Sequence, residues 1–77
     1  MKIYENDIIN QQSLSKKIAN FVKQQILEGQ LQPGDQLIVR NISEKLGVSQ
    51  TPVREAIQHL SGENIIVYIR NKGYFMY

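Results

Sequence analysis

Apolar side chains recur every three or four residues between Ser13 and Gly29, which is the spacing of one face of an α-helix. The positions are Leu14, Ile18, Phe21, Val22 and Ile26, and mostly polar residues lie between them. Serine often caps a helix start and glycine often ends a helix, so we expect the first helix between Ser13 and Gly29. Residues 1–12 show no clean period and are expected to form an N-terminal arm, either loose or docked on the domain.

A turn and a shorter helix are predicted next. Pro33 and Gly34 suit the two central positions of a type II turn, because proline fixes a negative φ and glycine accepts a positive one. Leu37 can form a short strand after this turn. The second helix is expected from about Val39 to Leu46, with a poorly capped start because Ile38 has no side-chain acceptor.

The residues that follow predict a tight turn and a third helix. Gly47 can take the left-handed conformation that closes the second helix, and Ser49 can cap the third. Pro52 lies in the first turn, where its missing N–H would have no helical partner in any case. An apolar stripe continues the helix from Gln50 to about Ser61, through Val53, Ala56, Ile57 and Leu60.

Two short strands are predicted at the end of the chain. Ile65 to Ile69 is apolar and mostly β-branched, Arg70 to Gly73 is typical of a turn, and Tyr74 to Tyr77 can form the second strand. Helix, short strand, two helices and a hairpin with a basic tip is the order of a winged helix. We therefore expect a mainly α domain with a small β-hairpin, a three-helix winged helix-turn-helix domain spanning residues 13–77.

Composition narrows the class of protein. The chain has 77 residues and no cysteine, so it is one small domain without disulfides, and with His59 as its single histidine we expect no metal site. The longest apolar run, Ile65 to Ile69, is too short to span a membrane, and the chain is expected to be cytoplasmic. Residues 40–77 hold five basic against three acidic residues. This local excess suits phosphate binding, although a mixed solvated surface explains it equally well.

Enzymatic function is not indicated. One histidine and no cysteine give no basis for a nucleophilic triad, the acidic residues show no telling spacing, and the isolated glycines form no phosphate loop, so no cofactor is expected. His59 is expected to have a structural role rather than to act as a pH switch. Tyr68, Tyr74 and Tyr77 are expected to pack on or cap the hairpin rather than to stack on bases.

Four ordered segments resemble the N-terminal domain of the GntR family of bacterial transcription regulators. They are residues 29–37, residues 42–49, Thr51 to Leu60, and Lys72 to Phe75. The Thr-Pro-Val-Arg-Glu-Ala run is most similar to the FadR-type subfamily. The resemblance implies binding to double-stranded operator DNA as a homodimer, with a separate C-terminal effector and dimerisation domain that is absent here. The sequence is then either a fragment or a lone DNA-binding unit, and the operator, the effector and the direction of control stay open.

The predicted DNA-binding residues lie at the second helix, the start of the third helix and the hairpin tip: Arg40, Ser49, Gln50, Thr51, Arg54, Lys72 and Gly73. By their own position, Gln50, Thr51 and Arg54 project from the start of a helix that is shaped to enter the major groove. The resemblance implies that Arg40 grips phosphate. It also implies that the tip glycine lets the backbone approach the minor groove, with Lys72 at phosphate.

Two positions depart from the family pattern. Gln50 stands where the family usually has arginine, and glutamine suits adenine whereas arginine suits guanine. We therefore expect a preference for adenine at the base that Gln50 contacts. Asn64 replaces a common glycine after the third helix, and asparagine tolerates a left-handed backbone well enough for the turn to survive.

Several alternatives are open at this point. Arg54 could be a surface residue that pairs with Glu55, Gln58 or solvent. Arg40 could merely solvate its helix, and Arg70 and Lys72 could be ordinary turn charges. At the level of function, the alternative is a winged helix that mediates protein contact or dimerisation and does not read DNA.

Overall fold

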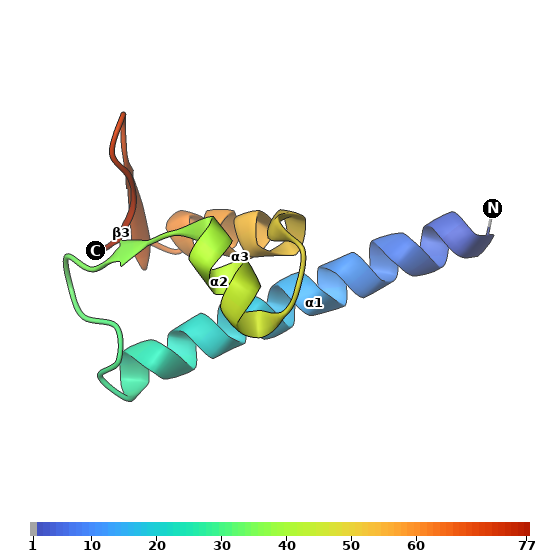
Figure 1. Ribbon diagram of the computed structural model, residues 1–77, viewed down its shortest axis with the longest axis horizontal. Coiled ribbons are helices and arrows are strands. Elements are labelled where there is room, and N and C mark those ends of the chain that lie inside the picture. The colour runs from blue at the N-terminus through green and yellow to red at the C-terminus, as the bar shows by residue number, and fades with distance from the viewer. Residues whose placement is uncertain (1) are drawn as a thin grey trace.

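Three helices and a three-stranded sheet make up the fold in the computed structural model (Figure 1). The backbone is described for residues 2–77 and the side chains for residues 13–77. In chain order the elements are α1 (Lys2–Leu27), β1 (Gln36–Leu37), α2 (Val39–Leu46), α3 (Gln50–Gly62), β2 (Ile66–Ile69) and β3 (Gly73–Met76). This is the predicted winged-helix order, and the expected fold class is confirmed.

The first helix begins earlier than the sequence pattern predicts. It starts at Lys2, so Ser13 lies inside α1 and does not cap its start. The first half of α1 extends away from the other elements in Figure 1, and a helix that leaves the body of a domain needs no apolar stripe. Residues 2–12 contain no glycine or proline, and extending an existing helix avoids a new nucleation step. The missing period therefore did not indicate a missing helix.

The other element boundaries differ from the predictions by at most one residue. The range Val39–Leu46 for α2 is as predicted, and Ile38 makes no side-chain cap hydrogen bond. The third helix runs one residue further than expected, to Gly62. Asn64 adopts the left-handed φ of 62° that its residue type tolerates.

The predicted hairpin forms part of a three-stranded sheet. Its strand order is β1-β3-β2 with both pairings antiparallel, so β1 adds a third strand to the predicted hairpin. Tyr74 of β3 lies between Leu37 and Tyr68 in the register. The turn before β1 is closed by a hydrogen bond from the Asp35 N–H to the Gln32 carbonyl at 3.0 Å, with Gly34 at a φ of 90°.

The core lies where α1 and α3 meet the inner face of the sheet. It draws apolar side chains from both helices and from all three strands: Ile18, Ala19, Val22, Leu37, Val53, Ala56, Ile57, Leu60, Ile66 and Met76. Leu60 and Ile57 are fully buried. The whole apolar stripe predicted for the third helix is therefore in the core, and its polar residues are left on the outside.

Candidate nucleic-acid interface

The turn between α2 and α3 is built as the sequence predicts. Gly47 closes α2 in the left-handed conformation, with φ 70° and ψ 33°. The N–H of Gly47 donates to the Glu44 carbonyl at 3.3 Å, and the N–H of Val48 donates to the Ser43 carbonyl at 3.0 Å. These bonds end α2 and turn the chain sharply into α3, which is the geometry of a helix-turn-helix.

Ser49 lies at the N-cap position of α3 but does not cap it. Its backbone is extended, with φ −70° and ψ 167°, yet its side chain makes no cap hydrogen bond. The expected position is therefore right and the expected hydrogen bond is wrong. Ser49 is exposed, and its side chain does not bond to the first N–H groups of α3.

The first turn of α3 is divided between the core and the surface. Pro52 and Val53 are buried, whereas Thr51 and Arg54 are exposed and Gln50 is partly exposed. Because the buried pair anchors the start of the helix, the polar side chains are carried on rigid backbone. The structure thus brings three of the predicted DNA-binding residues together on one exposed helix start.

Arg54 has a partner that the sequence did not suggest. Its Nη2 atom donates a hydrogen bond of 2.9 Å to the Oε1 atom of Gln50, one helical turn earlier. The alternatives raised from the sequence were Glu55 and Gln58, and neither makes an ion pair or hydrogen bond with Arg54 among the described side chains. Two candidate DNA-binding residues are therefore joined to each other.

The hairpin carries the second group of candidate residues, and we call it the wing. It projects beyond the helices on the side away from the extended half of α1 (Figure 1). Lys72 is exposed in its turn, and the Lys72 N–H donates to the Ile69 carbonyl at 2.9 Å. Gly73 has a φ of 112°, a backbone conformation that residues with a side chain rarely adopt. This glycine is therefore required by the backbone as well as by any close approach to DNA.

Gln36 is a residue of this site that sequence reasoning missed. It lies on β1, and its Nε2 atom donates a hydrogen bond of 2.9 Å to the Lys72 carbonyl in the wing turn. A Cβ atom at Gly73 would lie 3.2 Å from the same nitrogen. Gln36 thus ties the wing to the first strand, and a contact between residues so far apart in the chain leaves no local pattern to detect.

Arg40 and Lys45 lie on α2. Arg40 is exposed near the start of the helix, and its backbone carbonyl accepts a hydrogen bond of 2.9 Å from the buried Ser43 hydroxyl. The Lys45 Nζ atom lies 5.9 Å from the centre of the Phe21 ring on α1. Among the described side chains, that of Arg40 makes no hydrogen bond or ion pair with α1 or α3, whereas Lys45 is drawn towards an aromatic ring.

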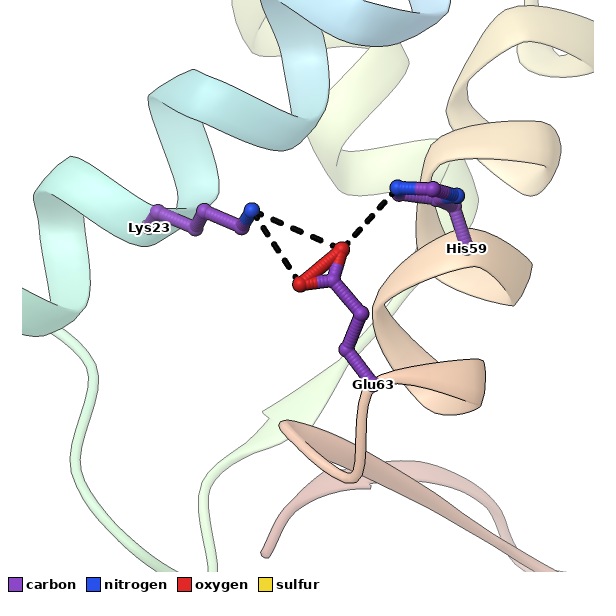
Figure 2. Close-up of polar contacts among 3 residues, drawn as sticks. All are labelled: Lys23, His59 and Glu63. Carbon is purple, nitrogen blue, oxygen red and sulfur yellow. Dashed lines mark hydrogen bonds and ion pairs between the residues drawn. The ribbon is translucent and has the colours of Figure 1, made fainter.

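His59 lies towards the other end of α3 and takes part in a cluster of polar contacts with Lys23 and Glu63 (Figure 2). Its Nε2 atom is 2.9 Å from one carboxylate oxygen of Glu63, and Lys23 of α1 approaches the other oxygen at 3.3 Å. The cluster joins the end of α3 to α1. It lies away from the first turn of α3, so the structure gives His59 a place between helices rather than among the candidate DNA contacts.

The tyrosines of the wing pack on each other. The ring centroids of Tyr68 and Tyr74 are 5.1 Å apart across β2 and β3, with the rings tilted by 54°. This contact agrees with the expected packing role for both. Tyr77, which was expected to share that role, is instead 75% exposed at the end of the chain.

The described residues contain no group of three or more His, Asp or Glu side chains that could hold a metal ion. None of their helices has the length and apolar content required to cross a membrane.

A comparison with known protein families shows to which family the chain belongs. Residues 14–76 match the family model described as bacterial regulatory proteins, gntR family. The chain belongs to the GntR family. The structure described above is thus that of a GntR winged helix-turn-helix DNA-binding domain, which includes the start of α3, the wing and the short strand β1.

Relatives of known name support the same family. The chain is 44% identical over 54 residues to the HTH-type transcriptional regulator McbR of Escherichia coli K12, and the match covers 70% of this chain and 24% of McbR. It is 33% identical over 64 residues to the repressor MngR of the same organism, covering 82% of this chain and 27% of MngR. The chain thus spans about a quarter of the length of these curated relatives, which are transcription regulators and not enzymes.

Solved structures share the fold. A GntR transcriptional regulator from Rhodococcus sp. RHA1 superimposes with a TM-score of 0.79 at 31% identity, over 83% of this chain and 31% of that one. YtrA from Sulfolobus acidocaldarius, a GntR-family transcription factor, gives a TM-score of 0.71 at 33% identity, over 80% of this chain and 66% of that one.

Proposed function

We propose that this GntR domain reads operator DNA with the start of α3 in the major groove and the wing at the adjacent backbone or minor groove. The observation that carries the proposal is the first turn of α3. Its buried Pro52 and Val53 fix the helix in the core, and its polar side chains are left to face a partner. A helix presented by its N-terminal end is the element that helix-turn-helix proteins insert into the major groove.

Each candidate residue has a role that suits its chemistry. Gln50 would contact adenine through its amide, and Arg54 would contact guanine or phosphate through its planar guanidinium. Ser49 and Thr51 would donate to phosphate at the helix start. Arg40 and Lys72 would neutralise phosphates on either side, and the bare backbone at the wing tip would allow close approach to the minor groove.

Tight binding would require two copies of the domain on a two-fold symmetric operator. One domain makes few phosphate and base contacts, so its affinity should be weak and should fall steeply with salt. The matched relatives are about four times as long as their matched segment, which leaves ample chain in such proteins for a dimerisation or effector domain. We extend this proposal to the finer assignment, a FadR-type regulator that acts in the cytoplasm as a homodimer, on the strength of the Thr51–Ala56 run.

Arg54→Ala tests the proposal most directly. A duplex would first be selected from a randomised library with the wild-type chain, and affinity would be measured by fluorescence anisotropy. The substitution should weaken specific binding by about 1–3 kcal/mol, because a bidentate arginine contact to a base is worth that much. Lys17→Ala is the matched control, because Lys17 is exposed on α1 outside the proposed contacts and carries the same charge.

The outcomes separate the two candidate functions. Affinity that falls with salt, and falls further for Arg54→Ala than for Lys17→Ala, supports DNA reading. Equal affinity of the two variants with an intact fold removes Arg54 from the contacts. A wild-type chain that selects no sequence and binds duplex DNA without salt dependence would overturn the proposal and leave protein contact as the function.

A further inference from the structure

We propose that Gln50 and Arg54 read DNA as a single unit, in which Arg54 fixes the orientation of the Gln50 amide. This inference rests on the proposed function and specifies how its central contact works. Gln50 is then a specificity-determining residue whose preference depends on Arg54. Arg54 is both a contact residue and a positioning residue for its neighbour.

The hydrogen bond between the two side chains sets the direction of the amide. A guanidinium group carries donors only, so the atom that Gln50 turns towards Arg54 must be its oxygen. The Oε1 atom lies 2.9 Å from Nη2 of Arg54. The amide nitrogen of Gln50 is thereby directed away from Arg54. Without this partner, an amide can turn over and offer its donor and acceptor in either order.

The Gln50 amide can still offer both a donor and an acceptor to a base while it is bonded to Arg54. A carbonyl oxygen has two lone pairs, so Oε1 can accept from Arg54 and still accept from a base. Together with an N–H of Nε2 it matches N6 and N7 of adenine. Arg54 retains N–H donors for the acceptors of guanine. The pair therefore fits an adenine and a neighbouring guanine in one order along the groove.

The neutral partner also preserves the charge of Arg54. Among the described side chains, the ion pairs do not include Arg54, although Glu55 is adjacent in the chain. A carboxylate partner would orient the guanidinium but would cancel its charge near phosphates. Glutamine orients it and leaves the positive charge for DNA. Two arginines at these positions would instead repel each other, so the pairing requires a residue other than arginine at position 50.

Binding-site selection with variants of the full chain tests the inference. The probe is a library of duplexes with a randomised core, and the base that Gln50 contacts is defined as the one whose preference Gln50→Ala abolishes. Arg54→Ala should lose its own guanine preference and should also lower the adenine preference at the Gln50 base by about threefold or more, as expected for directly bonded residues. Arg40→Ala is the control, since it removes one positive charge from the proposed interface without touching the amide.

A double-mutant cycle on the selected duplex supplies the second measurement. The losses for Gln50→Ala and Arg54→Ala, multiplied together, should exceed the loss for the double variant by about threefold or more. Far-ultraviolet circular dichroism checks that each variant remains folded, which we expect because Arg54 is exposed and Gln50 is partly exposed.

The possible outcomes keep the inference and the proposed function apart. In one outcome, the wild-type chain selects a motif and Arg54→Ala keeps the adenine preference at the Gln50 base. This result would overturn the inference and leave DNA reading standing. A guanine selected at the Gln50 base would overturn it equally. A wild-type chain that selects no motif at all would overturn the proposed function, and the inference with it. Loss of the adenine preference in Arg54→Ala but not in Arg40→Ala supports both.

Discussion

The tip of the wing depends on the conformation of one residue. Gly73 has a φ of 112°, and a Cβ atom there would lie 3.2 Å from Nε2 of Gln36. Both observations oppose a side chain at this position, one through the backbone and one through the neighbouring contact. The resemblance to the GntR family explained the glycine by access to the minor groove. The structure adds a reason that operates in the absence of DNA.

Gly73→Ala should therefore reduce stability as well as DNA binding. Holding a non-glycine residue at such a φ costs on the order of 1–3 kcal/mol, measured as the free energy of unfolding in urea. Gly62→Ala is the matched control, because Gly62 lies in α3 and a Cβ atom there would have no neighbour within 4 Å. That variant should be neutral or more stable by up to about 1 kcal/mol. Equal stability of both variants would show that the wing accommodates the strain.

Single side-chain contacts were the least predictable level of the structure. The types of Gln50 and Arg54 marked them as DNA-binding candidates, and their spacing of four placed them on one helix face. Their mutual bond still depended on rotamers that the sequence does not specify. Ser49 shows the converse: the residue type predicted a cap, the position is right, and the hydroxyl makes no cap bond.

Among the elements, those that pack against the core were the most predictable. The end of α2 followed from Gly47, and the buried face of α3 followed from its apolar stripe. The start of α1 was missed because periodicity reports packing rather than helix formation. Strand β1 was predicted only as a short strand at Leu37. Its pairing with β3 was not predicted, because this pairing joins residues far apart in the chain.

The contact between β1 and the wing leads to a prediction at this scale. Gln36→Ala should remove the hydrogen bond to the Lys72 carbonyl and leave the wing turn less firmly placed. Because this bond is exposed, the free energy of unfolding should fall by no more than about 0.5–1.5 kcal/mol. Affinity for the selected duplex should also fall, because Lys72 would contribute less to DNA binding from a loosely placed turn.

Anisotropy measurements on Gln36→Ala, Lys72→Ala and the double variant would test this coupling. If Gln36 acts through the wing, the affinity of the double variant for DNA should be about equal to that of the single variant with the lower affinity. Gln30→Ala controls for the loss of an exposed glutamine on a neighbouring loop. Losses that simply multiply would contradict a positioning role for Gln36.

The DNA-binding surface proposed above lies on a small body. In the proposal, the start of α3 and the wing are the two contact regions, and α1 extends away from the wing (Figure 1). In the proposed arrangement, a single copy covers one half-site of the operator. Each region carries few basic residues, so the electrostatic part of the affinity is limited. Joining two copies should raise affinity without any new contact, because the second binding event becomes intramolecular.

Fusion of a dimeric coiled coil after Tyr77 would test this expectation. On a duplex with two inverted half-sites, the fusion should bind at least about a hundredfold more tightly than the single domain. The gain should depend on spacing and be greatest when half-site centres lie about one helical turn, roughly 10 base pairs, or a multiple of it apart. A duplex with one half-site is the control and should show little gain. The slope of affinity against salt should also steepen, because more phosphates are neutralised. A fusion that gains nothing at any spacing would mean that the domain does not bind symmetric sites in pairs.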